Sequence, residues 1–387
     1  MAPTTTDATK EMYWGKVNGR LAGILFRADD DTVGNNDAAP SCVARDRIQE
    51  KGAKPMGTLQ EPLTVVIAQW QTVDAFHQAL ATPATYRIAP SAADADVISL
   101  LPGAHAIVTA VFSPAMAEAA DSLRLIQTPG AGVNGVAFDA VPDQTTVCNV
   151  YGHERGIAEY VFTTMGMLNR DYPGMDRRIR SGDWRDHLGP PLPELQGKTL
   201  TIIGLGHIGA EVARWGRFLD MRVVAATRTP DAERCQSAPV DRLVGMDALP
   251  TVLAEGDFVV LALPLSVETI GLIGAAELAD MKPTAFLINV ARGDVVDEAA
   301  LYTALRDRTI AGAAIDVWYR YPGLEGATLP ANLPFHELSN VIMTPHIAGA
   351  TEPTFLYRWS QINENLRRVR DGEPLLNVVA PACRLPS

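Results

Sequence analysis

Two side chains that can bind and protonate a carboxylic acid follow apolar runs in the second half of the chain. Arg292 comes directly after FLINVA, and His346 stands in TPHIAG after NVIM. An arginine presents parallel N–H groups that match a carboxylate, and a histidine titrates near neutral pH. Both are predicted at strand ends, where open α/β sheets bind ligands. They are candidate catalytic residues; the alternatives are a structural histidine and an ion pair of Arg292 with Asp294 or Asp297.

A glycine-rich segment predicts a dinucleotide site. TIIGLGHIGAEVA places Gly204, Gly206 and Gly209 at G-x-G-x-x-G spacing, between a buried strand and a helical pattern. The first glycine permits a tight turn, the second lets the backbone approach a pyrophosphate, and the third lets helix and strand pack closely. His207 and Ile208 begin the helix, whose positive end faces the phosphates. The alternative is a glycine-rich turn without a ligand.

The end of the next strand bears on which dinucleotide binds. In VVAATRTP, Thr227 occupies the place where NAD enzymes usually carry an acidic residue, and Arg228 follows. A carboxylate would repel a 2′-phosphate, whereas a hydroxyl and a guanidinium would bind it. We therefore predict NADP(H) as the preferred cofactor, with NAD(H) second. The alternative is that Arg228 stacks on adenine or faces solvent.

Alternating strand and helix patterns position these residues, and they predict an α/β fold with parallel sheets. Strands of a first series are predicted at 63–70, 105–112 and 123–130. A long helix over 154–181, kinked or divided at Pro173, leads into a second series. Its six strands are predicted within 199–205, 221–227, 257–264, 285–291, 312–318 and 340–346. Six strands with helical connections indicate a complete doubly wound dinucleotide fold.

The chain divides into three predicted parts. Residues 1–60 form an irregular N-terminal extension, either an arm onto a partner subunit or a flexible tail. Residues 61–165 and 350–387 form a discontinuous substrate-binding domain, because an amphipathic helix over 352–372 can return to the first series. Residues 166–349 form the dinucleotide-binding domain.

Composition excludes several classes of partner. The 387 residues carry a net charge of −12, so neither nucleic acid nor an anionic membrane surface is expected as a partner. No apolar run approaches the ~18 residues of a membrane span, and the N-terminus lacks a signal pattern. The cysteines, Cys42, Cys148, Cys235 and Cys383, show no CxxC spacing, so no metal site is predicted. These features together predict a cytoplasmic protein.

Several segments carry a resemblance to a known family. From about Leu63 to Val379 the chain resembles the D-isomer-specific 2-hydroxyacid dehydrogenases, through TPGAGVNG, IAEY, GLGHIG, ALPLSVETIGLI, LINVARGDVVDEAAL, AGAAIDVW and TPHIAG. This family includes glyoxylate/hydroxypyruvate reductases, phosphoglycerate dehydrogenase and formate dehydrogenase. The resemblance implies two Rossmann-like domains, an active site in the crevice between them, hydride transfer with a nicotinamide, and a homodimer. Pro264, in ALPLSVETIGLI, is expected beside the cofactor.

The resemblance also implies roles for single residues. Arg292 would bind the substrate carboxylate and polarise its carbonyl group. His346 would be the acid/base that protonates the carbonyl oxygen. Asp316 matches an aspartate near the nicotinamide, and Ala131 and Gly132 match the loop whose amides hold the carboxylate.

One position departs from the family pattern. Most members carry a glutamate five residues after the aspartate, where it hydrogen-bonds the histidine, but here this position is Tyr321. A carboxylate would raise the pKa of His346, whereas a neutral tyrosine only orients the ring. We therefore predict that His346 loses its proton at lower pH than in relatives with the acid, and that reduction slows earlier as pH rises. Glu325, folding back as a substitute partner, is the less favoured alternative.

His153, in NVYGHERGIAEY, is a further candidate for substrate binding. It lies in the loop that faces the substrate in relatives, where it would add a cation for a dianionic or polar substrate; a solvent-facing histidine is the alternative. The predicted function is NADP(H)-linked reduction of a small 2-keto acid. The neutral Tyr321 favours formate-like oxidation as an alternative, which His153 opposes because formate dehydrogenases carry asparagine in this loop. A nucleotide-binding corepressor is the alternative from another class.

Overall fold

The computed structural model describes residues 13–17, 20–24, 57–68, 81–184, 191–230, 238–322 and 328–379. The chain separates into two compact units, Met1–Lys51 and Gly52–Ser387. In the first unit, β1 (Tyr13–Val17) pairs antiparallel with β2 (Arg20–Ile24), a hairpin that the sequence pattern did not predict. Glu325 and three of the cysteines, Cys42, Cys235 and Cys383, lie outside the described residues.

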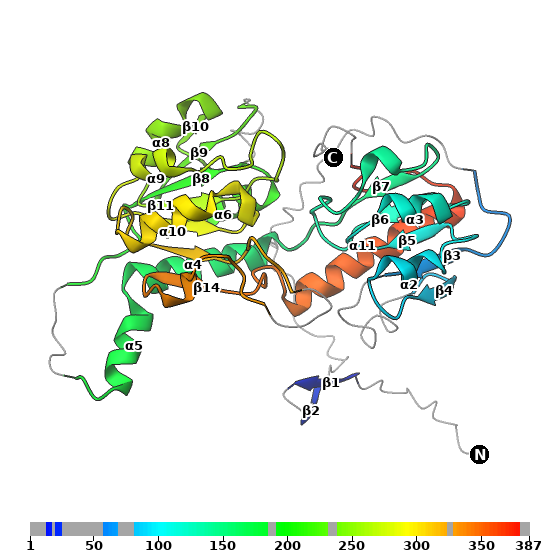
Figure 1. Cartoon of the computed structure of the whole chain (residues 1–387), viewed down its shortest axis with the longest axis horizontal. Coiled ribbons are helices and arrows are strands. Elements are labelled where there is room, and N and C mark those ends of the chain that lie inside the picture. The colour runs from blue at the N-terminus through cyan, green and yellow to red at the C-terminus, as the bar shows by residue number, and fades with distance from the viewer. Residues whose placement is uncertain are drawn as a thin grey trace, which may run out of the picture. The chain divides into compact units, whose positions relative to one another are not determined.

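The second unit contains a five-stranded sheet whose strand order is β4-β3-β5-β6-β7, with all described pairs parallel (Figure 1). The strands are β3 (Thr64–Ile67), β4 (Thr85–Ile88), β5 (Ala106–Val108), β6 (Leu125–Gln127) and β7 (Thr146–Cys148). The prediction of β3, β5 and β6 is confirmed, whereas β4 and β7 were not expected. This order is one of the two common doubly wound arrangements.

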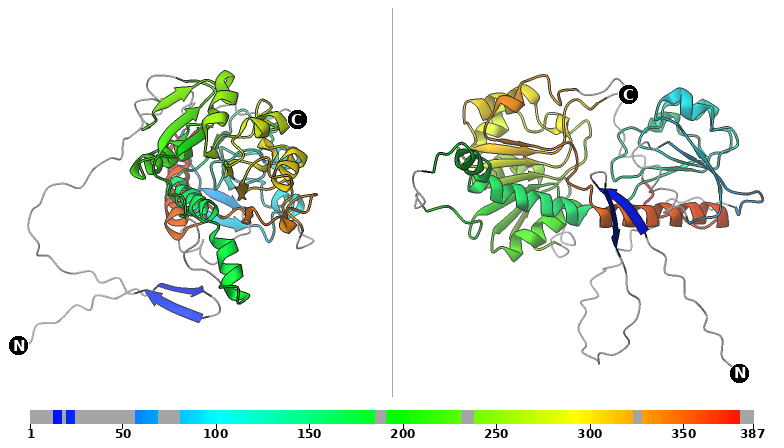
Figure 2. Two further views of the ribbon diagram at one scale, coloured as in Figure 1. Left: turned by 90° about the vertical axis from the view of Figure 1, so that its left-hand side faces the viewer. Right: turned by 90° about the horizontal axis from the view of Figure 1, so that it is seen from below.

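Helices pack against both faces of the five-stranded sheet. The connecting helices α2 (Asp94–Ile98) and α3 (Pro114–Ala119) join one buried cluster with Val66, Ile107 and Ile126. The long helix α11 (Glu352–Asp371), red in Figure 2, covers the opposite face of this sheet. It joins a second buried cluster through Trp359, Ile362 and Leu366. Neighbouring residues of β3, β5 and β6 point to opposite faces, which explains why nearly every residue of these short strands is buried.

A parallel seven-stranded sheet has the order β10-β9-β8-β11-β12-β13-β14. Its strands are β8 (Thr199–Ile203), β9 (Arg222–Ala226), β10 (Arg242–Val244), β11 (Phe258–Leu261), β12 (Phe286–Asn289), β13 (Gly312–Ile315) and β14 (Val341–Met343). All six predicted strands are present, and β10 was not expected. The first six strands reproduce the order of a dinucleotide-binding fold.

Two helical layers cover the seven-stranded sheet. On one face, α4 (Glu154–Asn169) and α6 (His207–Phe218) pack against Leu200, Val223 and Val260. On the other face, α8 (Leu249–Glu255), α9 (Ala275–Asp280) and α10 (Glu298–Arg306) pack against alternate residues of the same strands. The predicted α/β architecture of two parallel-sheet domains is confirmed.

The predicted long helix is divided, as expected, close to Pro173. Helix α4 ends at Asn169, and α5 (Tyr172–Arg180) begins after Asp171, which adopts φ +49° and accepts a hydrogen bond from the N–H of Gly174. Pro173 lies in the first turn of α5, where a missing N–H costs no helical hydrogen bond.

Helix α11 confirms the predicted amphipathic segment. Thr351 caps its N-terminus, and Gly372, with φ +73°, ends it in the left-handed conformation. The helix packs on the five-stranded sheet although about 200 residues separate it from β7. The predicted bounds of the two domains stay a prediction. None of the helices in the described ranges has the length and apolarity that crossing a membrane requires.

Candidate active site

The glycine loop between β8 and α6 has the geometry of a phosphate cradle. Gly204 adopts φ +101°, and a Cβ there would lie 2.5 Å from the carbonyl oxygen of Ala262. A Cβ on Gly209 would lie 2.1 Å from the oxygen of Gly204, whereas one on Gly206 would meet no atom within 4 Å. The space over Gly206 is therefore open, and α6 begins there without a side-chain cap. Free N–H groups at a helix start suit a pyrophosphate, so these residues fit a dinucleotide.

The remaining predicted cofactor residues lie around this loop. His207 is exposed at the first position of α6 and stacks on Tyr151, with ring centroids 4.2 Å apart. Ile208 is half-buried beside it. Pro264 follows β11, the strand next to β8, and its carbonyl oxygen accepts a hydrogen bond from Thr269. Three more predicted residues, His207, Ile208 and Pro264, are thus placed just beyond the carboxyl ends of the adjacent strands β8 and β11.

The end of β9 presents a cation. Thr227 is buried, and its N–H donates to the oxygen of Val244. Arg228 is exposed and lies 3.5 Å from Glu268, which is also exposed. This pair is weak, since solvent screens it, and a stronger anion can displace the glutamate.

Arg292 follows β12 and lies close to the loop that follows β6 and contains Ala131 and Gly132. A Cβ on Gly132 would lie 1.9 Å from Nη2 of Arg292, so the guanidinium occupies the space that glycine leaves. Nη1 donates to the carbonyl oxygen of Ala291 at 2.6 Å. Burial lowers the pKa of Arg292, although a guanidinium remains charged at neutral pH. The structure therefore brings Arg292 and Gly132 together, next to Ala131, as the sequence predicted.

His346 and Tyr321 form a hydrogen-bonded pair. The Tyr321 hydroxyl lies 2.9 Å from Nδ1 of His346 and accepts a hydrogen bond from the N–H of Trp318 at 3.3 Å. Burial lowers the pKa of His346 most strongly, and the positive charge of Arg292 lowers it further, while Asp316 opposes the shift. The ring thus has a neutral partner at Nδ1, which leaves Nε2 for a substrate.

Asp316, at the end of β13, fixes the loop that carries His346. Its carboxylate is almost fully buried and accepts hydrogen bonds from the N–H groups of Ile347 and Ala348, each at 2.9 Å, and from the Thr344 hydroxyl at 2.6 Å. His346 itself adopts φ +59°, a left-handed conformation that costs a non-glycine residue free energy. These hydrogen bonds hold the strained residue in place; contact of Asp316 with a nicotinamide stays a prediction.

The structure agrees with neither alternative predicted for His153, a cation that binds the substrate or a histidine that faces solvent. It is buried, with 4% of its surface exposed, so it does not face solvent. Burial lowers its pKa to about 4, and the charge of Arg358 contributes to this shift. The imidazole is therefore neutral at physiological pH, and the predicted role as a cation is wrong because removal from water beside other cations disfavours protonation. A hydrogen-bonding role remains open to it.

Comparison with known proteins agrees with this geometry. Residues 162–348 match the family model for the NAD binding domain of D-isomer specific 2-hydroxyacid dehydrogenases. A glyoxylate reductase of Korarchaeum cryptofilum is 32% identical over 296 residues, which cover 73% of this chain and 85% of that protein. The chain belongs to the D-isomer-specific 2-hydroxyacid dehydrogenase family. This confirms the resemblance drawn from its motifs.

Other members of the family extend the comparison. A D-3-phosphoglycerate dehydrogenase of Archaeoglobus fulgidus is 36% identical over 68% of this chain, but the match covers 48% of that protein, so the chain spans about half the length of such relatives. The crystal structure of a family member from Xanthobacter autotrophicus Py2, in complex with NADPH and MES, is 32% identical with a TM-score of 0.68. The superposition covers 83% of this chain and 99% of that one.

Sequence reasoning missed one charged residue of this 2-hydroxyacid dehydrogenase site. Arg358 lies on α11, where the sequence pattern shows only an amphipathic helix. Its charge contributes to the lowered pKa values of both His153 and His346. Burial lowers the pKa of Arg358 itself, and Glu154 opposes the shift. An arginine on an amphipathic helix is ordinarily a solvent-exposed residue, so no sequence signal marked it.

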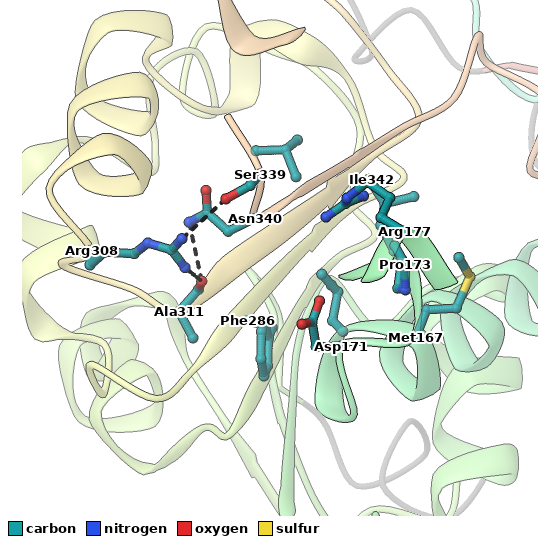
Figure 3. Close-up of a pocket in the computed structure, with 12 residues that line it drawn as sticks. Met167, Asp171, Pro173, Arg177, Phe286, Arg308, Ala311, Ser339, Asn340 and Ile342 are labelled. Atoms are coloured by element: carbon teal, nitrogen blue, oxygen red, sulfur yellow. Dashed lines mark hydrogen bonds between the residues drawn. The ribbon is translucent and has the colours of Figure 1, made fainter. Parts of the chain in front are cut away.

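A separate cavity of about 380 Å³ lies at the amino ends of strands of the seven-stranded sheet (Figure 3). Phe286, Ala311 and Val341 line it where β12, β13 and β14 begin. Arg308 reaches into it but donates hydrogen bonds to Ala311 and Ser339. Because the strands are parallel, this cavity is distant from the carboxyl ends that carry the glycine loop and Arg292.

Proposed function

We propose that this chain catalyses the NADP(H)-linked reduction of a small 2-oxo acid to the 2-hydroxy acid. The observation that carries the proposal is the pairing of His346 with Tyr321 in a site whose guanidinium, Arg292, lies against Gly132. A carboxylate binder and a proton donor are the two groups that this reduction demands of a protein.

The side chains divide the work of carboxylate binding and proton transfer. The nicotinamide cofactor, when bound, supplies the hydride. Arg292 and the backbone at Ala131 and Gly132 bind the carboxylate and orient the carbonyl group of the substrate. Nε2 of protonated His346 gives its proton to the carbonyl oxygen as negative charge develops there. The hydrogen bonds from the His346 loop to Asp316 keep the ring in position.

Tyr321 controls where the histidine carries its hydrogen. The N–H of Trp318 donates to the phenol oxygen, so the hydroxyl hydrogen is directed to Nδ1 of the neutral ring. In the protonated ring, Nδ1–H donates to the same oxygen, which has a second lone pair. A phenol stabilises this cation less than a carboxylate does. Because the pKa of His346 is lowered, the proton donor is present at acidic pH and is lost before the pH reaches neutrality.

The preference for NADP(H) is part of the proposal. Arg228 is exposed at the end of β9, and Thr227 offers no charge that would repel a 2′-phosphate. A phosphate dianion is a stronger partner for a guanidinium than the distant Glu268 carboxylate. Replacing Arg228 by glutamine should raise the KM for NADPH by about tenfold while changing the KM for NADH little.

The proposal includes the state of the protein in the cell. We propose a cytoplasmic homodimer that acts on a small carboxylate and binds no nucleic acid or membrane. Tyr172, Ile179 and Trp184, on and after α5, expose large apolar surfaces, which suit contact with a second copy. The net charge of −12 argues against nucleic acid.

The test is turnover of both cofactors with a panel of 2-oxo acids. Glyoxylate, hydroxypyruvate, pyruvate and phenylpyruvate are offered with NADPH or NADH between pH 5 and pH 9. The expected result is faster turnover with NADPH and a rate that falls on the alkaline side at lower pH than in a relative with glutamate beside the histidine. Absence of turnover with every 2-oxo acid would contradict the proposal.

A second candidate is the oxidation of formate on the same scaffold. The neutral partner at Nδ1 of His346 favours it, because formate oxidation releases no hydroxyl proton. Reduction of NADP⁺ or NAD⁺ by formate would support this candidate. Its rate should not depend on the protonation of His346.

A further inference from the structure

Buried polar atoms without hydrogen-bond partners gather in one part of the described structure. The loop between β7 and α4 contributes Oδ1 of Asn149, Nδ1 of His153 and Oε1 of Glu154, and α11 contributes Nε of Arg358. Buried polar atoms are almost always paired, because an unpaired one retains the cost of leaving water. Of these four atoms, Nδ1 of His153 and Nε of Arg358 can donate a hydrogen bond to a bound anion, whereas the two oxygens only accept and do not contribute to an anion site.

Arg358 is the charged member of this group. Its guanidinium is largely buried, and among the described residues it makes no hydrogen bond and no ion pair. Burying a cation without a contacting counterion is unfavourable, so such groups are found where a ligand anion binds. The nearby charge of Glu154 offsets Arg358 through space, while its own Oε2 accepts a hydrogen bond from the N–H of Gly152 at 2.8 Å.

His153 and Arg358 reach the same space. A Cβ built on Gly349 would lie 3.2 Å from Cβ of His153 and 3.4 Å from Nη2 of Arg358. Gly349 comes three residues after His346, so this space adjoins the acid/base residue. The neutral imidazole of His153, with Nδ1 unpaired, can donate a hydrogen bond without carrying a charge.

The second cation is distinct from the carboxylate binder. Arg292 comes from the end of β12 and lies against Gly132, whereas Arg358 comes from α11 and lies against Gly349. Both charges act on His346 and on His153, so all four side chains lie within electrostatic reach. One guanidinium suffices for the carboxylate of a 2-oxo acid, which leaves Arg358 for another group.

We propose that Arg358 and His153 form a second anion-binding subsite, so that the substrate is a 2-oxo acid with another oxyanion at its far end. This oxyanion is a carboxylate or a phosphate monoester. The inference rests on the proposed reductase function and names its substrate class. Arg358 donates two parallel N–H groups to the oxyanion, and His153 donates a third hydrogen bond.

The test compares substrates that differ only in the far group. Oxaloacetate is compared with 2-oxobutanoate, and 3-phosphohydroxypyruvate with hydroxypyruvate. The full chain should show kcat/KM about 10- to 100-fold higher for the member of the preferred pair that carries the far oxyanion, which is the loss expected when a charge-assisted hydrogen bond is removed. Arg358→Gln should abolish this preference, so that the two members of the pair have kcat/KM values within about threefold of each other. The pair with the larger ratio identifies the oxyanion as carboxylate or phosphate.

Matched variants separate recognition from structure. Arg358→Lys keeps the charge and should retain part of the preference. Arg370→Gln removes a charge from the same helix where the arginine pairs with Asp371, and should leave both ratios unchanged. Equal kcat/KM for both members of each pair, or an equal loss for both in Arg358→Gln, would overturn the proposal.

A binding measurement keeps this inference distinct from the reductase function. Calorimetry of succinate and butyrate, which are not reduced, should show tighter binding of the dianion and loss of that difference in Arg358→Gln. If no 2-oxo acid is reduced but succinate binding depends on Arg358, the subsite stands and the reductase function fails. If 2-oxo acids without a far oxyanion are reduced and succinate binds no better than butyrate, the subsite fails and the reductase function stands.

Discussion

The two loops that would face the reactants differ in how their polar groups are satisfied. The glycine loop of the seven-stranded sheet is defined by missing side chains, and its open space over Gly206 follows from backbone geometry. The loop from Asn149 to Glu154, after the five-stranded sheet, is defined by buried side chains in each of which one polar atom lacks a hydrogen-bond partner. The first loop is a general device for any dinucleotide. The second loop carries His153 of the proposed anion-binding subsite, so we expect this loop to distinguish the substrate of this chain from the substrates of its relatives.

The largest expected effect is on proton transfer. His346→Gln removes the acid/base but can keep a hydrogen bond to Tyr321. We expect kcat for 2-oxo acid reduction to fall about 10²- to 10⁴-fold, with cofactor binding unchanged within a factor of two or three. Steady-state kinetics and fluorescence titration of NADPH would check both parts. An equal loss in cofactor affinity would show that the residue acts on the fold.

A pair of substitutions tests which glycine of the loop is required for stability and which is required for cofactor binding. Gly209→Ala would press a Cβ onto the oxygen of Gly204, so we expect a loss of about 1–3 kcal/mol in the free energy of unfolding. Gly206→Ala meets no atom, so stability should change by less than about 1 kcal/mol, while NADPH binding weakens about tenfold or more. Denaturant unfolding and cofactor titration of both variants would distinguish the two roles; the reverse pattern would contradict this division.

Titration of His153, in the loop from Asn149 to Glu154, should make the stability of the protein depend on pH under acidic conditions. The pKa of His153 is about 4 in the folded protein and near 6.5 when unfolded, so the unfolded chain binds more protons between these values. The free energy of unfolding should therefore fall by up to about 3 kcal/mol as pH drops from 6.5 to 4. His153→Gln should reduce this slope, since it removes the titrating group. An unchanged slope in the variant would show that His153 does not hold this pKa.

The smallest expected effect concerns Tyr321. Tyr321→Glu would place a carboxylate beside His346 and raise its pKa, so the proton donor would persist to higher pH. We expect the alkaline limb of kcat/KM to move up by about one pH unit, which is about tenfold in rate on that limb. Tyr321→Phe serves as a control that removes the hydroxyl and should produce no upward shift. A glutamate variant with an unmoved limb would assign the limb to another group.

Long apolar patterns made most of the fold predictable. Nine strands and the two long helical segments were expected because each buries an apolar face with a clear period. The strands β1, β2, β4, β7 and β10 were missed, and of these β4 and β10 are only partly buried. Such segments become strands because a neighbouring strand offers hydrogen bonds, which no local pattern records.

Much of the candidate site was also predictable, for a local reason. The glycine loop needs a residue with positive φ, Gly204, and room for backbone contacts within six residues. Only glycines meet these demands easily, so the loop can be recognised from the sequence. Arg292, His346 and Tyr321 could be named because strand ends converge at one edge of a parallel sheet. The sequence by itself thus determined the glycine loop of a dinucleotide fold, the arginine proposed to bind the carboxylate and the absence of a carboxylate at position 321.

Only the tertiary structure decided the rest. Whether His153 is a cation depends on burial and on charges from distant segments, and these make it neutral. Arg358 lies about 200 residues from His153, yet helix α11 returns to the first sheet and brings both to Gly349. Protonation and ligand recognition depend on solvent exposure and on charges within a few ångströms, and a chain acquires those neighbours only when it folds.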